Sequence, residues 1–289
     1  MNDNLQIVVT GASGFIGKNF RKFLSENNVK TISISRNDFK KFRNETKIIS
    51  KKYNEKSIIS KIKNSNALVH LIGIGKQTVE NDFLSINTVL TQKIVELCKK
   101  SNIKKLIYTS GLGVSKKSTL GYFISKYKAE QHIINSNLDY TIFRPSYIVG
   151  KDDLLTRNLK LQMKKTLIKI PGSGKYSIQP IFINDVSKLI LKSILEKNFS
   201  KKILDLVGQD TMTYEEYVRQ FSYNTDTKIK KIDLELAYFQ AISCTNPDFA
   251  VDDLNLLVGN FVGNHQKLKS LSKMRFESVK ELLKTRSLF

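Results

Sequence analysis

Short apolar segments alternate with amphipathic helical segments along the first half of the chain. Gln6–Thr10 reads as a buried strand, and Phe15–Asn27 places Phe20 and Leu24 on one face of a helix. The same pattern predicts strands at Thr31–Ser35, Lys47–Ser50, Ala67–Ile72, Lys105–Thr109 and Tyr140–Arg144, and helices at Glu55–Lys63, Phe83–Ser101 and Tyr122–Ser136. This alternation predicts an α/β fold, a doubly wound parallel sheet of the Rossmann type with helices on both faces.

The regular alternation of strand and helix patterns becomes weaker after Gly150. Helices are expected at Leu154–Thr166 and Asn184–Leu195, a strand at Ile203–Val207, and a capping box from Thr213 to Glu216. The final 60 or so residues have a mainly helical pattern. We therefore expect a dinucleotide-binding core over 1–150 and a small, mainly helical substrate cap over 151–289, with 176–210 returning to the core sheet.

A glycine-rich turn joins the first strand to the first helix. Its residues are Gly11, Ala12, Ser13, Gly14, Phe15, Ile16 and Gly17, with the glycines spaced as G-x-x-G-x-x-G. The first glycine permits a sharp turn, the second lets backbone approach a diphosphate, and the third lets the helix pack on the strand. Free N–H groups at the helix start attract anions, so this turn predicts a dinucleotide site rather than a simple tight turn.

The end of the second strand indicates which dinucleotide binds. Ser35 and Arg36 stand where an acidic residue would bind the ribose hydroxyls of NAD. A hydroxyl and a guanidinium suit a 2′-phosphate, so the sequence favours NADP, with NAD as the alternative. The competing interpretation is that Arg36 simply points to solvent.

A tyrosine and a lysine follow at helical spacing. Tyr122 and Lys126 are four residues apart, which puts both on one face of the predicted helix. A neighbouring ammonium favours a phenolate and is expected to lower the pKa of Tyr122 from about 10. The pair could then exchange a proton with a substrate hydroxyl or carbonyl while hydride moves to or from a nicotinamide. The alternative is a half-buried aromatic side chain beside a surface lysine.

Together these motifs resemble one enzyme family over residues 6 to about 210. The chain is similar to short-chain dehydrogenases/reductases of the extended or atypical kind, the NAD-dependent epimerase/dehydratase group. The atypical branch, which it most resembles, includes the nucleotide-binding accessory subunit of respiratory complex I and its prokaryotic stand-alone relatives. The matching segments are Thr10–Gly17, Leu68–Leu71, Asn87, Tyr108–Ser110, Tyr122–Glu130, Phe143–Ser146 and Gln179–Val186.

The resemblance implies roles for individual residues. Tyr122 would be the acid/base, Lys126 its partner, and Ser110 or Thr109 would orient the substrate oxygen. Asn87 would brace the sheet or a water near the site. The cofactor would also contact Ile72, Gly73, Arg144, Pro145 and Ser146.

One departure from the family pattern bears on activity. Gly111 stands where full epimerases usually carry a third hydroxyl residue. Two functions therefore remain open. The first is an NAD(P)-dependent oxidoreductase or epimerase acting on a hydroxyl/carbonyl centre, with a nucleotide-activated sugar as one candidate substrate. The second is a catalytically weak NAD(P)H-binding protein that serves in assembly or redox sensing.

Composition and charge limit the classes of ligand and partner that we expect the protein to bind. The net charge is +22, with lysines spread along the chain, so a lysine-rich surface is favoured over a specific nucleic-acid site. The charge also favours an anionic substrate. The basic stretch Lys160–Lys169 is a candidate phosphate contact, with a solvated helix face as the equally supported alternative. Apolar runs are too short for a membrane span, the N-terminus shows no signal peptide, and Cys98 and Cys244 have no metal-binding or disulfide spacing.

We accordingly expect a cytoplasmic protein with no metal, and a homodimer is the candidate oligomeric state. His70, His132 and His265 are isolated in the sequence and are expected to be structural.

Overall fold

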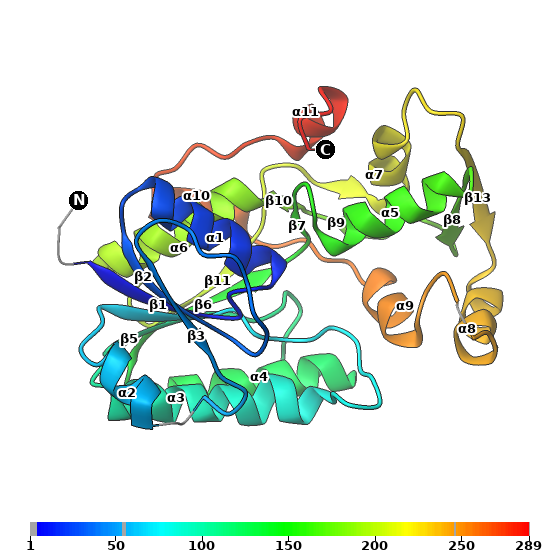
Figure 1. Ribbon diagram of the computed structural model, residues 1–289. Helices are drawn as coiled ribbons and strands as arrows, with labels where there is room; N and C mark the ends of the chain where they lie inside the picture. The colour runs from blue at the N-terminus through cyan, green and yellow to red at the C-terminus, as the bar shows by residue number, and fades with distance from the viewer. Residues whose placement is uncertain (1–4, 54–55, 246, 289) are drawn as a thin grey trace.

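A parallel sheet of seven strands forms the centre of the computed structural model, which describes residues 5–53, 56–245 and 247–288. The strand order is β11-β6-β5-β4-β1-β2-β3, and every pair is parallel (Figure 1). The strands are β1 (Gln6–Thr10), β2 (Lys30–Ser35), β3 (Glu45–Ile49), β4 (Ala67–His70), β5 (Lys105–Thr109), β6 (Asp139–Pro145) and β11 (Lys202–Leu206). In register, Thr10 of β1 lies beside Ile34 of β2 and His70 of β4, so the carboxyl ends of these strands share one edge.

Helices cover both faces of this sheet, as the doubly wound pattern predicts. On one face α1 (Phe15–Glu26), α6 (Ile183–Leu195) and α10 (His265–Ser272) pack over Val9, Ile107 and Phe143. On the other face lie α2 (Lys56–Ile62), α3 (Leu90–Lys100) and α4 (Gly121–Ile134), drawn below the sheet in Figure 1. The fold is thus the predicted Rossmann-type α/β sandwich.

A second group of elements forms the cap, at the right of Figure 1. Its helices are α5 (Leu154–Lys164), α7 (Tyr214–Phe221), α8 (Leu234–Ser243), α9 (Val251–Leu257) and, beside α7, α11 (Val279–Lys284). Its short strands pair as β7 (Ile148–Val149) with β10 (Ile181–Phe182), β9 (Ser177–Ile178) with β12 (Met212–Thr213), and β8 (Leu167–Pro171) with β13 (Lys228–Ile232). The predicted capping box between Thr213 and Glu216 is present at the start of α7.

The observed elements differ from the predicted ones in several places, among them the short strands β7, β9, β10 and β12, which were not predicted. The expected helix Phe83–Ser101 begins with a π-helical turn, η1 (Leu84–Val89), before α3. The pairing of β8 with β13 was missed, and so was the short 3₁₀ turn η2 (Lys197–Phe199). Glu55, the expected start of a helix, lies outside the described residues, as do residues 1–4 of the N-terminus.

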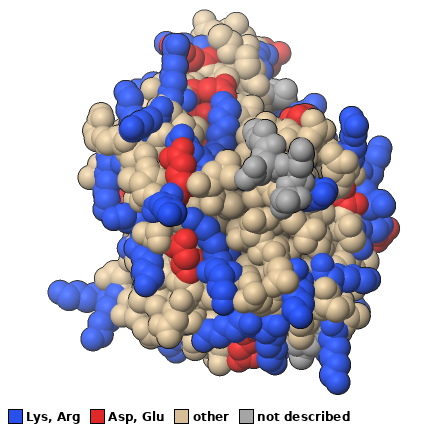
Figure 2. Space-filling view, turned by 90° about the vertical axis from the view of Figure 1, so that its left-hand side faces the viewer, with Lys and Arg blue, Asp and Glu red and all other residues tan. Residues whose placement is uncertain are grey.

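The surface carries basic side chains over a wide area. Figure 2 shows Lys and Arg scattered across the visible face, with only a few acidic residues between them. On this face the charge is spread out, as expected for a lysine-rich surface. Among the described residues, no helix has the length and apolar character needed to cross a bilayer.

Candidate functional site

The glycine-rich turn is shaped by two backbone contacts that leave no room for side chains. Gly11 has φ +76°, and a Cβ there would lie 2.9 Å from the Leu71 carbonyl carbon. A Cβ on Gly17 would lie 2.2 Å from the Gly11 oxygen, so α1 packs directly against the turn. No side chain caps α1, whose N-cap is Gly14. The N–H groups of the first turn of α1 are therefore available to an anion.

An ion pair beneath the turn fixes its position. Arg21 of α1 donates from Nη1 to the Ala12 carbonyl oxygen at 2.7 Å, and its guanidinium pairs with Glu45 of β3. Both side chains are only 2% exposed. Because a buried charge pair is costly to separate, Arg21 holds the turn to the β2–β3 edge of the sheet. Sequence reasoning missed this contact, which joins residues 24 positions apart.

The predicted adenosine contacts lie at the end of β2. Ser35 Oγ lies 2.8 Å from Ser13 Oγ, so the two hydroxyls join the strand end to the glycine-rich turn. Arg36 is exposed, and its Nη1 donates to Asn81 Oδ1 at 3.2 Å. This single exposed contact leaves the guanidinium able to turn toward a ligand phosphate.

A cavity of ≈190 Å³ lies beyond the glycine-rich turn, at the carboxyl ends of β4 and β5. Its lining includes Ile72 and Gly73 after β4, Ser110 after β5, and Tyr122 and Lys126 from α4. Within the described residues, the buried Ser110 Oγ has no hydrogen-bond partner. A buried, unpaired hydroxyl facing a cavity fits a ligand oxygen, because such groups are costly to leave unsatisfied.

Lys126 is buried in this cavity. Its Nζ lies over the Tyr108 ring, 5.1 Å from the ring centroid, and donates to the Thr109 carbonyl oxygen at 3.2 Å. A Cβ on Gly73 would lie 2.5 Å from Nζ, so glycine is needed there for the lysine to fit. Burial lowers the pKa of Lys126 to about 8, although Glu130 opposes the shift. A buried ammonium with few partners is typical of a functional site rather than of a structural one.

Tyr122 has a pKa shifted opposite to the sequence-based expectation. Burial raises the pKa of Tyr122 to about 12, so the predicted lowering by Lys126 is wrong for this structure. The phenol packs edge-on against Phe83 and Phe123, with ring centroids 5.9 and 5.1 Å away, and these rings exclude water. Tyr122 is therefore a neutral phenol near pH 7, the form that donates a proton.

Asn87 holds the loop after β4 in place. Its Oδ1 accepts from the Ile74 N–H at 2.9 Å, and its Nδ2 donates to the Ile74 oxygen and to Ser125 Oγ, both at 3.0 Å. Asn87 thus joins the segment beside Gly73 to α4, which carries Tyr122. It lies in the π-helical turn η1, and such turns are frequent at functional sites.

A second cavity, of ≈140 Å³, lies on the other side of Tyr122. Tyr122 and Pro145 line both cavities, while Leu256 and Phe261 come from the cap. Phe261 packs against Phe123 with ring centroids 6.1 Å apart. The phenol therefore stands between a space beside the glycine-rich turn and a space enclosed by the cap.

Comparison with known proteins agrees with this geometry. The family model for NAD(P)H-binding proteins matches residues 11–171, which is more than half of the chain. The chain belongs to this NAD(P)H-binding family. The match contains the glycine-rich turn, Ser110, Tyr122 and Lys126.

Relatives within and around this family are diverse. The NAD(P)H-binding chain is 27% identical over 154 residues to subunit 9 of the NADH dehydrogenase 1 alpha subcomplex of Arabidopsis thaliana, covering 52% of this chain and 38% of that protein. It is 25% identical over 157 residues to an uncharacterized sugar epimerase of Bacillus subtilis, and the match covers 50% of this chain and 64% of that protein. The chain thus spans less than two thirds of the length of these curated relatives.

Solved structures share the whole fold. UDP-glucose 4-epimerase of Thermotoga maritima, solved with UDP-glucose, superposes with a TM-score of 0.74 at 18% identity, over 97% of this chain and 96% of that one. MoeE5, solved with UDP-glucose and NAD, superposes with a TM-score of 0.74 at 15% identity, and the match covers 98% of this chain and 100% of that one. The NAD(P)H-binding chain therefore has the fold of short-chain dehydrogenases and epimerases.

Other predicted site residues have partners elsewhere in the NAD(P)H-binding chain. Arg144 forms a two-point ion pair with the buried Glu130, at 2.9 and 2.6 Å, and it is not among the residues that line either cavity. Ser146 lines the second cavity, and its Oγ donates to the Phe261 oxygen at 2.8 Å. His70 is structural, as expected, because its nitrogens contact Thr10 and Thr91 hydroxyls and burial lowers its pKa to about 3.

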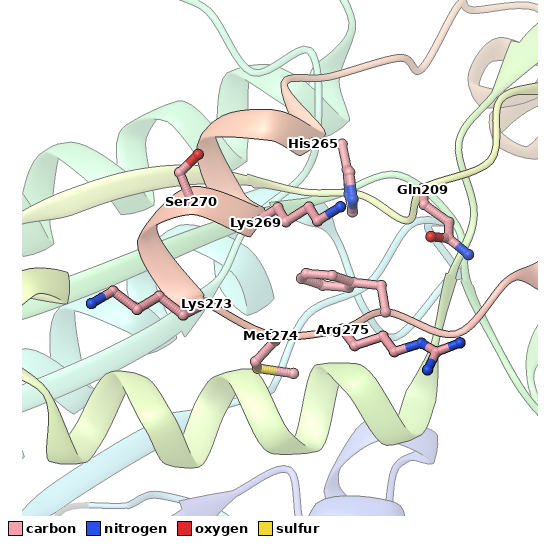
Figure 3. A pocket seen from close by; sticks show the side chains of 8 residues that line it. Gln209, His265, Lys269, Ser270, Lys273, Met274 and Arg275 are labelled. Atoms are coloured by element: carbon pink, nitrogen blue, oxygen red, sulfur yellow. The ribbon is translucent and has the colours of Figure 1, made fainter.

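A separate cavity of ≈380 Å³ lies beside α10, away from Tyr122 (Figure 3). Lys269, Lys273 and Arg275 line it, and all three are exposed. His265 Nδ1 contacts the Val207 oxygen at 3.1 Å, and its ring packs on Phe276, which indicates a structural role. No group of His, Cys, Asp and Glu suited to a metal ion occurs among the described residues.

The buried ammonium of Lys126 gives a prediction for stability. The folded-state pKa of about 8 lies below the 10.5 of an ordinary lysine, so between these values the unfolded chain binds more protons. The free energy of unfolding of the parent should therefore rise with pH over this window relative to Lys126→Met, by up to ~3 kcal/mol. Urea unfolding of both proteins at pH 7 and pH 10 measures this difference. Lys128→Met, on the exposed part of α4, should show no such change, and a constant gap between parent and Lys126→Met would contradict the prediction.

Proposed function

We propose that the protein is an NAD(P)-dependent oxidoreductase or epimerase acting at a hydroxyl or carbonyl centre. The observation that carries the proposal is the position of Tyr122, which lines both the cavity beside the glycine-rich turn and the cavity beneath the cap. A nicotinamide dinucleotide fits the residues present, since Gly11 and Gly17 bring backbone close and Ser110 Oγ is buried without a partner. The family resemblance supports a nucleotide-activated sugar as one candidate substrate.

Tyr122, Lys126 and Ser110 have separate proposed roles in proton transfer. When bound, the nicotinamide would supply or accept the hydride. Tyr122 Oη donates its proton to a carbonyl oxygen during reduction, and it recovers the proton from the hydroxyl in the reverse direction. Lys126 stabilises the phenolate that remains, because its ammonium lies on the same face of α4 and is shielded from water. Ser110 Oγ donates a hydrogen bond that orients the substrate oxygen.

The protonation state of the free site suits carbonyl reduction. Burial holds Tyr122 as the neutral phenol, with a pKa near 12, so the proton that reduction needs is already in place at pH 7. Oxidation requires that this pKa fall when cofactor and substrate bind. The positive charge of an oxidised nicotinamide ring would act in that direction.

NADP is the proposed cofactor, with NAD as the alternative. Arg36 follows Ser35 at the end of β2, and its exposed guanidinium can leave Asn81 to bind a 2′-phosphate in two-point fashion.

We expect Arg36→Met to weaken NADPH binding roughly tenfold or more, since a hydrogen bond to a charged group contributes about 1.5–3 kcal/mol. NADH binding should be unchanged. Titration of NADPH and NADH fluorescence measures both constants, and Arg43→Met, an exposed arginine of the same loop, is the matched control. Equal loss for the two cofactors would refute the assignment of Arg36. If neither cofactor binds the parent protein, the proposed function itself fails.

A second candidate function is a catalytically weak NAD(P)H-binding protein used in assembly or redox sensing. Similarity to the complex I subunit of Arabidopsis thaliana favours it. The intact Tyr122 and Lys126 pair favours the enzyme. Cytoplasmic localisation and a homodimer stay predictions.

A further inference from the structure

The cleft on the cap side of Tyr122 lacks cationic side chains. It consists of two adjoining cavities of ≈140 and ≈240 Å³, which share Ser146, Tyr147 and Leu256. Although 48 of the 289 residues are Lys or Arg, none of the described residues lining either cavity is basic. The substrate side of the site therefore differs sharply from the rest of this protein, whose surface is strongly basic.

Aromatic rings form the part of the cleft nearest the phenol. Phe261 packs between Phe123 and Tyr147, with ring centroids 6.1 and 6.4 Å away. Its backbone is fixed on both sides, because its N–H donates to the Ser177 oxygen at 2.7 Å and its oxygen accepts from Ser146 Oγ. This preformed apolar slot suits a flat, apolar group placed next to Tyr122.

Two carboxylates lie at the far end of the cleft. Asp153 caps α5 and accepts from the Gly150 and Thr156 N–H groups at 3.0 and 2.9 Å. Asp253 accepts from the Ala250 N–H at 3.0 Å at the start of α9. Both residues line the larger cavity, so the ionisable carboxyl groups in its lining have no basic counterpart there, while burial raises the pKa of Asp153. A phosphate or carboxylate placed there would lose its hydration and meet like charge.

The lysines expected to receive a phosphate lie away from this cleft. Asn158 and Gln162 on α5 line the larger cavity. Lys165 and Lys169, by contrast, both pair with Asp248, at 3.2 and 2.8 Å. Lys165 and Lys169 thus pair with an acidic residue of the cap, and no lysine of the stretch Lys160–Lys169 is among the residues that line the cleft.

We propose that the substrate is a flat, apolar aldehyde, ketone or alcohol that is neutral or cationic, and that anionic substrates, nucleotide-activated sugars among them, are excluded. This inference rests on the proposed function, because it assigns the cap-side cleft to the substrate of Tyr122. It reverses both the anionic substrate expected from net charge and the nucleotide-activated sugar suggested by the family resemblance.

Three benzaldehydes that differ in one para substituent test the inference. The tert-butyl and trimethylammonio compounds have nearly the same shape and differ in charge, and the carboxylate compound carries the opposite charge. Isothermal titration calorimetry into the protein, with and without NADP, measures binding without requiring turnover. We expect the neutral and cationic aldehydes to bind at least tenfold more tightly than the carboxylate and than UDP-glucose.

Charge removal provides an internal check. Asp253→Asn keeps the acceptor for Ala250 and should lower the preference for the cationic over the anionic aldehyde several-fold. Asp252→Asn is the matched control: Asp252 does not line the cleft, and the variant should keep the parent preference.

The outcomes separate this inference from the proposed function. Equal or tighter binding of UDP-glucose or the carboxylate overturns the inference, as does failure of all three aldehydes to bind. If the expected order of binding holds but NADPH reduces none of the aldehydes, the proposed catalysis fails, and only the preference of the cleft for neutral and cationic ligands is upheld.

Discussion

Replacing Tyr122 by phenylalanine is expected to lower kcat for hydride exchange with NADPH by about 10²–10⁴-fold, the usual contribution of a positioned acid or base. The hydroxyl group is the only difference between the two side chains. Tyr122 lines both cavities, and its ring is held by Phe83 and Phe123. NADPH binding should remain close to that of the parent, because the ring is kept. Steady-state reduction of a neutral aromatic aldehyde and NADPH fluorescence titration measure the two quantities.

A matched control is available on the same helix. Tyr127 lies on α4, is half-buried and lines neither cavity, so Tyr127→Phe should leave kcat within about twofold of the parent. Equal rates for parent and Tyr122→Phe would remove the acid/base role and favour the binding or sensing function. A loss of NADPH affinity in Tyr122→Phe would indicate that the hydroxyl instead helps to hold the cofactor.

The shape of the glycine-rich turn and the placement of Tyr122 and Lys126 on one helix could be predicted because they depend mainly on local geometry. Gly17 acts through backbone contacts within one strand–turn–helix unit, and Tyr122 with Lys126 needs only four residues of helix. Strand order follows from repeated β-α units and their right-handed connections. These features depend on spacing along the chain, which a sequence displays directly. The close approach of Gly11 to Leu71, by contrast, joins segments 60 residues apart and does not show in the local spacing.

The cleft on the cap side of Tyr122 could not be predicted because segments far apart in the sequence build it. Phe261 reaches Phe123 across more than a hundred residues, through a cap with no repeating pattern. The pairing of β8 with β13 joins segments about 60 residues apart, and Lys-Ile-Lys-Lys-Ile is a weak strand signal. The pKa direction of Tyr122 was wrong for a related reason: it depends on desolvation by packed side chains, and spacing alone does not reveal how completely a group is buried.

Gly111 offers a different outcome from the one that family comparison suggests. The resemblance implies that a missing hydroxyl at this position weakens catalysis. In the structure, a Cβ on Gly111 would lie 2.8 Å from Tyr122 Oη and 3.1 Å from Cε1 of the same ring. The space that a serine side chain would need is thus partly occupied by the phenol, and glycine is what allows Tyr122 to stand at the cavity wall.

We therefore expect Gly111→Ala and Gly111→Ser to lower kcat roughly 10-fold to 100-fold, with stability reduced by about 1–3 kcal/mol, as in other overpacked sites. The backbone at Gly111 is not in the left-handed region, so the added side chain rather than strain causes the effect. Steady-state rates and urea unfolding of both variants measure it. In a Tyr122→Phe background the stability cost should shrink, because the nearest atom, Oη, is gone. An increase in kcat for Gly111→Ser would show instead that a hydroxyl at this position assists catalysis and that the Tyr122 side chain shifts to make space for it.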